Sequence, residues 1–200
     1  MEKDKSICVF GDSTSWGAWD EEKGGWVNRL WLFLADHEPY SPIFNLGIDG
    51  GTSKTILERF EKEAEVRNAG VLIFQTGGND ASTPSLSGLC NISLDDFKKN
   101  ILEIIEKAKA ITDKIVFLDL KNCDETKTLP VSWGEYYYNN ENILKYSKVM
   151  QNICTEKEVL FLDIEKLQDD EFEDGLHPNA KGHQKIFLQV RDFLLDKKII

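Results

Sequence analysis

Five short apolar segments alternate with amphipathic segments along this chain, and that alternation is the strongest constraint on its fold. The apolar segments cover residues 6–10, 43–46, 71–75, 114–118 and 159–162, and they are rich in Val, Ile, Leu and Phe without a regular polar alternation. Apolar runs of this length are typical of strands that are covered on both faces, as in a parallel sheet. We therefore predict five parallel strands.

The segments between these strands have the periodicity of helices with one buried face. The predicted core positions of the five helices are Trp26, Val27, Leu30, Trp31 and Leu34; Ile56, Leu57 and Phe60; Leu94, Phe97, Ile101, Ile104, Ile105 and Ala108; Ile143, Leu144, Met150 and Ile153; and Ile186, Phe187, Val190 and Leu194. Thr52, Ser53 and Ser93 are predicted capping residues. Repeated strand–helix alternation predicts a doubly wound α/β/α sandwich with a five-stranded sheet, and no repeat or linker divides residues 1–200, so we expect one domain.

Charge and composition exclude several classes of protein. The formal net charge is −11 over 200 residues, which opposes binding to nucleic acid or to an anionic membrane. The chain starts without the apolar segment of a secretory signal and contains no run of 18 apolar residues, so we expect a cytoplasmic protein without a membrane span. Its four cysteines form no CxxC pair and are expected to be reduced thiols, with Cys8 and Cys154 in the core.

Polar or glycine-rich segments follow the predicted strands. Residues 11–13 (GDS) come after the first strand, 45–53 (NLGIDGGTS) after the second, 76–80 (TGGND) after the third, and 173–183 (EDGLHPNAKGH) after the fifth. Ligands of open parallel sheets bind outside the carboxyl ends of the strands. These segments should therefore meet at one edge of the sheet and form a site, and the longer connections 81–92 and 121–139 should help to shape it.

The chain has three histidines, and their sequence contexts differ. His37 ends the first predicted helix, where a cation interacts favourably with the helix dipole, and His183 lies within the last helical pattern as a surface or packing residue. His177 precedes Pro178, which disfavours helical backbone and keeps His177 in a loop. Asp174 stands three residues earlier, so one turn would bring its carboxylate to Nδ1 of His177 and leave Nε2 free as a base.

A base in this position could activate a serine. Ser13 follows the first strand, and its hydroxyl becomes a nucleophile only if a base accepts its proton. The oxyanion that forms on attack needs donors already in place. Candidate donors are the backbone N–H groups of Ser13 and Gly50 and the side-chain amide of Asn79. Asp12 and Asp80 are expected to organise the loops by hydrogen bonding.

These four segments, in this order, resemble the conserved blocks of the SGNH (GDSL-type) hydrolase family: GDS, GIDGGTS, GGND and DGLHP. The resemblance spans nearly the whole chain and departs at Thr14, which stands where the family name has Leu. It implies a flavodoxin-like fold and roles for Ser13 as nucleophile, Asp174 and His177 as its partners, and Gly50 and Asn79 as oxyanion donors, with Gly47 and Gly51 as alternative glycines.

The resemblance further implies a serine esterase that cleaves a small or short-chain carboxylic ester through an acyl-enzyme, without a metal or an organic cofactor. Carbohydrate O-deacetylase, thioesterase and lysophospholipase activities of the same family are alternatives. Trp16, Trp19, Trp133 and Tyr136 are candidates for the wall of the substrate pocket, together with the rest of the tyrosine run 136–138. Packing is the alternative role for these aromatic residues.

Two rival hypotheses come from other classes of protein. The segment 47–55 (GIDGGTSKT) faintly resembles a phosphate-binding loop, but Ser53 rather than glycine precedes the lysine. A non-catalytic module that binds a ligand on the same fold is the second rival. The acidic segment 163–174 lacks the spacing of a calcium loop and is expected to be a solvated surface. The oligomeric state is not specified by any of these patterns.

Overall fold

The centre of the molecule is a parallel sheet of five strands, β1 (Ser6–Gly11), β2 (Ile43–Gly47), β3 (Ala69–Gln75), β4 (Ile115–Leu118) and β5 (Leu160–Leu162). The computed structural model describes residues 6–36, 42–119 and 122–200, so the role predicted for His37 lies outside the described residues. The strand order is β2-β1-β3-β4-β5, and every neighbouring pair is parallel. The predicted doubly wound sheet is therefore confirmed.

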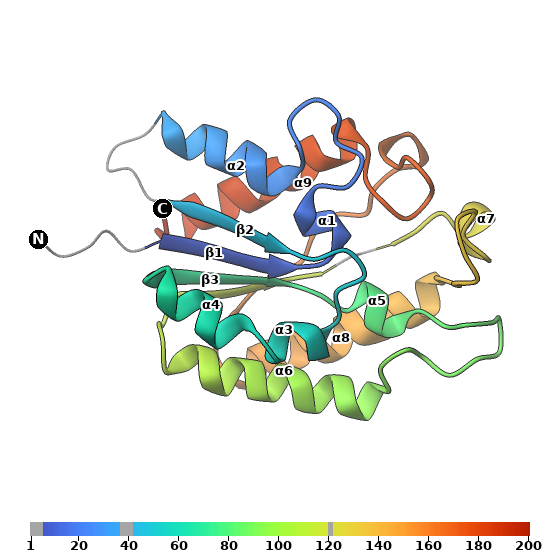
Figure 1. The fold of residues 1–200 in the computed structure, drawn as a ribbon, viewed down its shortest axis with the longest axis horizontal. Coiled ribbons are helices and arrows are strands. Elements are labelled where there is room, and N and C mark those ends of the chain that lie inside the picture. The colour runs from blue at the N-terminus through green and yellow to red at the C-terminus, as the bar shows by residue number, and fades with distance from the viewer. Residues whose placement is uncertain (1–5, 37–41, 120–121) are drawn as a thin grey trace, which may run out of the picture.

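Helices cover both faces of this sheet (Figure 1). They are α1 (Ser13–Trp16), α2 (Trp26–Ala35), α3 (Ser53–Leu57), α4 (Phe60–Val66), α5 (Gly78–Ala81), α6 (Leu94–Lys109), α7 (Glu125–Thr128), α8 (Asn140–Glu156) and α9 (Ala180–Asp196), with a 3-10 turn at Asp169–Glu171. In Figure 1, α2 and α9 lie on one face, whereas α3, α4, α6 and α8 lie on the other. Within the described ranges, no helix is both long and apolar enough to cross a membrane.

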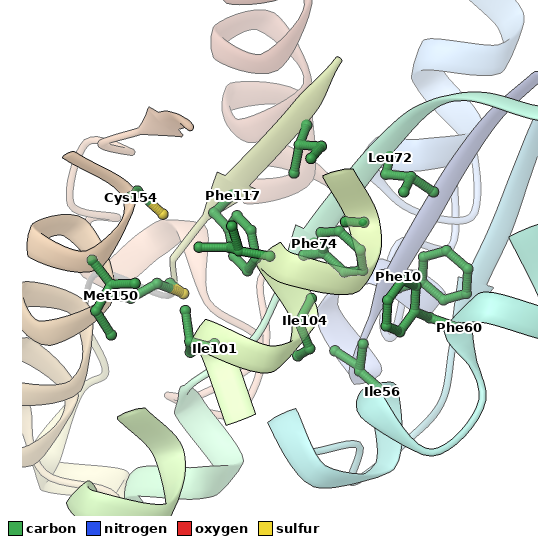
Figure 2. Close-up of a cluster of buried hydrophobic side chains, with 14 of the residues drawn as sticks. Phe10, Ile56, Phe60, Leu72, Phe74, Ile101, Ile104, Phe117, Met150 and Cys154 are labelled. Carbon is green, nitrogen blue, oxygen red and sulfur yellow. The ribbon is translucent and has the colours of Figure 1, made fainter. Parts of the chain in front are cut away.

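A row of phenylalanines fixes the register of the central strands (Figure 2). Phe10 of β1 is paired with Phe74 of β3, which is paired with Phe117 of β4. Their rings stack, with centroids 5.6 Å apart for the first pair and 5.0 Å for the second. Such cross-strand aromatic pairs stabilise one alignment of the strands. The same alignment sets the relative positions of the loops that follow β1 and β3.

The core between the sheet and α3, α4, α6 and α8 contains Cys8 and Cys154, which confirms that both are core residues. The second helical pattern was predicted as one helix, but the structure divides it into α3 and α4. The backbone of Arg59 is non-helical at the break, and its guanidinium donates to the carbonyl of Leu46 in β2. Two further errors concern Trp31 and Leu144, which were assigned to the buried faces of their helices and are 39% and 37% exposed.

Candidate active site

Ser13 stands where β1 passes into α1, at the carboxyl edge of the sheet. The preceding residue, Asp12, is the N-cap of α1, and its Oδ1 accepts a hydrogen bond from the backbone N–H of Thr14 at 2.9 Å. Asp12 is buried, and its other carboxylate oxygen faces Nε2 of Gln75, whose Oε1 accepts from the hydroxyl of Ser15. The side chains next to Ser13 therefore hold the turn, as predicted for Asp12, and leave the hydroxyl of Ser13 to other partners.

That hydroxyl faces a histidine from the far end of the chain. Nε2 of His177 lies 2.9 Å from Oγ of Ser13, although the two residues are 164 positions apart. Nδ1 of His177 lies 2.7 Å from Oδ2 of Asp174, and Oδ1 of Asp174 accepts the backbone N–H groups of Leu176 and His177 at 3.0 and 2.8 Å. The contact with Asp174 directs Nε2 toward Ser13, so the imidazole can accept the hydroxyl proton.

The turn between Asp174 and His177 depends on a glycine. Gly175 has a φ of +91°, a conformation that side chains disfavour. A β-carbon at this position would also come within 2.7 Å of Cβ of Lys127. The turn therefore brings the aspartate and histidine together over three positions only because residue 175 has no side chain.

The structure distinguishes among the three candidate glycines of the loop after β2. The N–H of Gly47 donates to Oδ1 of Asn45 at 3.0 Å, and that of Gly51 donates to the carbonyl of Ile48 at 2.9 Å. Among the hydrogen bonds of the described residues, the N–H of Gly50 has no acceptor. Gly50 also lines the same cavity as Ser13, so of the three it is the glycine with an N–H left to donate.

Asn79, in α5, lies on the same cavity. Its Nδ2 donates to the carbonyl of Gly51 at 2.9 Å, and its Oδ1 accepts from the hydroxyl of Tyr138 at 2.8 Å. The next residue, Asp80, is fully buried and accepts from both the backbone N–H and the hydroxyl of Ser53. Asp80 thus ties the loop after β3 to the start of α3, which agrees with the organising role predicted for it.

Ser13, Gly50, Asn79 and His177 open onto a cavity of about 330 Å³. The rest of its wall is formed by Asp49, Ser82, Asn91, Trp133, Tyr136 and Tyr138. Of the four aromatic residues expected in the pocket, Trp133 and Tyr136 line the cavity, and their rings lie 5.8 Å apart. The other two, Trp16 and Trp19, are not among its lining residues.

Two of these aromatic residues, Trp133 and Trp19, also contact the ring of His177. Trp133 packs against the ring of His177 at 5.9 Å and donates from Nε1 to Oδ2 of Asp174 at 3.1 Å. Trp19 is 53% exposed and meets the His177 ring edge-on at 6.3 Å. Trp16 is 56% exposed, so the pocket role expected for it has no support in its position.

Two carboxylates near Ser13 have pKa values shifted in opposite directions. Burial alone would raise the pKa of Asp174, but the hydrogen bonds from His177 and Leu176 hold it well below the ordinary range. The pKa of Asp12 is raised to about 6, because burial outweighs the hydrogen bonds from Thr14 and Gln75 and the attraction of His177. Asp174 therefore stays ionised beside the histidine even in weakly acidic solution, where Asp12 takes up a proton.

Sequence reasoning did not single out Asp49, Ser82 and Asn91 among the lining residues, and Tyr138 entered it only through the tyrosine run 136–138. Asp49 lies within the glycine-rich segment, and the other three lie on the long connections that had been expected to shape a site. The run 136–138 of three tyrosines was visible in the sequence, but periodicity could not indicate that the third one is buried and reaches Asn79.

Other residues considered from the sequence have packing roles. His183 is fully buried, where its Nδ1 accepts from the N–H of Trp26 and its Nε2 contacts the carbonyl of Ala18. This is the packing role rather than the surface role.

In the suggested phosphate loop, the N–H and hydroxyl of Ser53 are already bound to Asp80. The part of the chain that the structure describes has no group of three or more His, Cys, Asp or Glu side chains placed to hold a metal ion.

Comparison with known structures shows the same fold. The chain is similar to a lipase/acylhydrolase from Enterococcus faecalis, with a TM-score of 0.77 and 21% identity over 96% of both chains. TesA gives a TM-score of 0.75 at 20% identity over 95% of this chain and 98% of that one. A catalytic mutant of Axe2, an acetylxylan esterase from Geobacillus stearothermophilus, gives 0.71 at 17% identity over 97% and 95%.

Comparison of sequences gives a family as well as a fold. No curated protein sequence matches the chain significantly. The model of the GDSL-like lipase/acylhydrolase family, by contrast, matches residues 9–185, which include every segment that forms the site. The chain therefore belongs to the GDSL-like lipase/acylhydrolase (SGNH hydrolase) family and is an ester hydrolase of that family.

Proposed function

We propose that the protein is a serine esterase that hydrolyses small or short-chain carboxylic esters through an acyl-enzyme formed on Ser13. The observation that supports this most directly is the pair of contacts that connects Asp174 to His177 at 2.7 Å and His177 to Ser13 at 2.9 Å, beside a cavity. Catalytic mutants of Axe2 have its serine, aspartate or histidine replaced by alanine, the same three residue types.

In the first half of the reaction, His177 accepts the proton of Ser13, and Oγ attacks the ester carbonyl carbon. The negative charge that develops on the carbonyl oxygen is stabilised by the N–H groups of Ser13 and Gly50 and by Nδ2 of Asn79. Asp174 stabilises the imidazolium that forms. His177 then gives its proton to the leaving alcohol, and the acyl group stays on Ser13.

In the second half, water takes the place of the alcohol. His177 removes a proton from this water, which attacks the acyl carbonyl carbon, and the same donors hold the second oxyanion. Oγ of Ser13 leaves and takes back the proton from His177, which releases the carboxylic acid. Every group needed for these steps is a side chain or backbone N–H of the chain itself.

The test compares Ser13→Ala with Ser132→Ala, which changes an exposed serine that does not line the cavity. Hydrolysis of p-nitrophenyl acetate and butyrate should be lost in Ser13→Ala and unchanged in Ser132→Ala, with equal thermal stability. A fluorophosphonate probe should label the parent protein and Ser132→Ala but not Ser13→Ala. Unchanged hydrolysis in Ser13→Ala, or label on another residue, would refute the mechanism, and binding of esters without turnover would favour a non-catalytic module.

A second candidate function is removal of O-acetyl groups from a carbohydrate. It is favoured by the Trp133–Tyr136 pair, which offers apolar faces, next to the polar side chains of Asp49 and Asn91. By contrast, the net charge of −11 and the carboxylate of Asp49 disfavour anionic substrates such as acyl-CoA. The test measures kcat/KM on acetylated xylo-oligosaccharides, p-nitrophenyl esters of increasing chain length, acyl-CoA and lysophospholipid. A higher kcat/KM for the sugar acetates supports this function, and a higher kcat/KM for any other class contradicts it.

A further inference from the structure

The hydroxyl of Tyr138 contacts the amide side chain that faces the candidate oxyanion site. Tyr138 is 5% exposed, and its hydroxyl lies 2.8 Å from Oδ1 of Asn79, 59 residues away in sequence. On the other side of the same amide, Nδ2 lies 2.9 Å from the carbonyl oxygen of Gly51. The amide of Asn79 is thus held between one hydroxyl and one carbonyl.

These two partners determine which way the amide points. A carbonyl oxygen can only accept, so the atom of Asn79 that faces Gly51 must be the nitrogen. The atom that faces Tyr138 must then be the oxygen, and the tyrosine hydroxyl must donate to it. Burial raises the pKa of Tyr138 above its ordinary value, so the hydroxyl keeps its proton at neutral pH. A rotated amide would place two acceptors against each other at Gly51.

An amide nitrogen carries two hydrogens, and the carbonyl of Gly51 takes one of them. Among the described residues, the hydrogen bonds provide no acceptor for the second. Asn79 lines the cavity together with Ser13, Gly50 and His177, so the second hydrogen remains to donate to a ligand. Whether this hydrogen faces a developing oxyanion depends on the rotation of the amide, and the hydroxyl of Tyr138 opposes that rotation.

Tyr138 is itself fixed by the backbone around it. Its N–H donates to the carbonyl of Thr128 at 3.0 Å, and the hydroxyl of Thr128 donates back to the carbonyl of Tyr138 at 2.8 Å. The neighbouring Tyr137 exchanges two backbone hydrogen bonds with Thr83, at 2.9 and 3.0 Å. Thr83 lies two residues after the end of α5, the helix that contains Asn79. The tyrosine and the asparagine are therefore tied to the same short stretch of backbone.

We propose that Tyr138 is a positioning residue, whose hydroxyl holds the amide of Asn79 in the orientation that donates to the oxyanion. This inference rests on the proposed function, because it assigns the amide to an oxyanion. Tyr138 acts through Asn79 and not on the substrate carbonyl, since the single hydrogen of its hydroxyl is already donated to Oδ1.

The test is Tyr138→Phe, with Tyr137→Phe as the matched control one position away. Loss of one neutral hydrogen bond should lower kcat for p-nitrophenyl acetate by about 3- to 10-fold, with little change in KM, whereas the control keeps the parent kcat. In an Asn79→Ala background, Tyr138→Phe should have no further effect on kcat. An equal loss in that background, a loss confined to KM, or an unchanged kcat would each overturn the proposal.

A readout that does not need turnover separates this inference from the proposed function. The side-chain amide signals of Asn79 in a ¹H–¹⁵N spectrum are assigned by their absence in Asn79→Ala. They should shift or broaden in Tyr138→Phe and stay in place in Tyr137→Phe. If they stay in place in both variants, the amide is not held by Tyr138, even if Ser13 proves to be the nucleophile. If they respond but Ser13→Ala remains active, the proposed mechanism fails while the contact stands.

Discussion

A sharp prediction concerns the dependence of stability on pH and the buried carboxyl group of Asp12. Its pKa is raised from an ordinary value of 3.8 to about 6, chiefly by burial. The native state therefore holds a proton on Asp12 at pH values where the unfolded chain has released it. Between those two pKa values, the free energy of unfolding must fall as pH rises.

The size of this effect follows from the shift. Each pKa unit corresponds to about 1.4 kcal/mol, so ionising the buried group costs the native state about 3 kcal/mol in total. About 2 kcal/mol of that cost appears between pH 4.5 and 7.5, and above this window it is constant because both states are ionised. Asp12→Asn removes the titrating group and keeps a side-chain oxygen for the N–H of Thr14, which is the cap of α1.

The assay is urea unfolding of the parent protein and Asp12→Asn at several pH values from 4.5 to 7.5. The difference between their unfolding free energies cancels the titration of the groups that do not interact with Asp12; His177 and Asp80 do interact with it. It should change by about 2 kcal/mol across this range, with the parent losing stability relative to the variant as pH rises. Asp12→Ser, which also caps a helix, should behave in the same way and has no second polar atom to meet Gln75. A difference that is constant to within about 0.5 kcal/mol would refute the reasoning.

Three other changes have definite expected outcomes. Trp133→Phe keeps an aromatic ring but removes the indole hydrogen bond to Asp174, so kcat/KM for p-nitrophenyl acetate should fall by about 3- to 10-fold. An unchanged kcat/KM would show that this hydrogen bond does not contribute to catalysis. Gly47→Ala would place a β-carbon 2.3 Å from the backbone nitrogen of Trp16, so thermal and urea unfolding should show a loss of more than about 3 kcal/mol, and a loss under about 1 kcal/mol would contradict the close approach. Arg29→Met leaves the buried carboxylate of Asp20 without its guanidinium partner and should cost about 3–5 kcal/mol in urea unfolding; a stability equal to that of the parent would mean that backbone N–H groups alone satisfy the carboxylate.

Gly50→Ala is a useful comparison for the glycine prediction. A β-carbon on Gly50 would meet no atom within 4 Å, and the only expected penalty is its φ of +68°. We expect a cost of about 1–2 kcal/mol, smaller than that of Gly47→Ala. The reverse order would mean that the loop after β2 adapts to a side chain at position 47.

Much of the fold could be predicted because it depends on local patterns. A strand buried on both faces must be apolar along its length, so the runs at 6–10 and 71–75 identified β1 and β3 to within two residues. It then followed that the motif segments meet, since parallel strands bring their carboxyl ends to one edge of the sheet. Ser13 and His177 were singled out on this basis, and the structure places them 2.9 Å apart.

Local patterns failed where a distant segment decides the outcome. At the break between α3 and α4, Arg59 reaches the carbonyl of Leu46 in β2, a contact that helical periodicity cannot show. The exposure of Trp31 is a second case, because an apolar position on a helix is buried only where another element covers it.

The sequence by itself determined the strands, the edge at which the polar segments meet and the residue types that occupy it. Each of these is encoded within a few adjacent positions. Only the tertiary structure decided which glycine keeps a free N–H, which aromatic side chains line the cavity, and that Tyr138 holds Asn79. The contacts of Tyr138 with Asn79 and of Ser13 with His177 join residues that are 59 and 164 positions apart, and they exist only after the sheet has brought the loops together. The free N–H of Gly50 depends on the folded backbone of its own loop, where Gly47 and Gly51 already have acceptors.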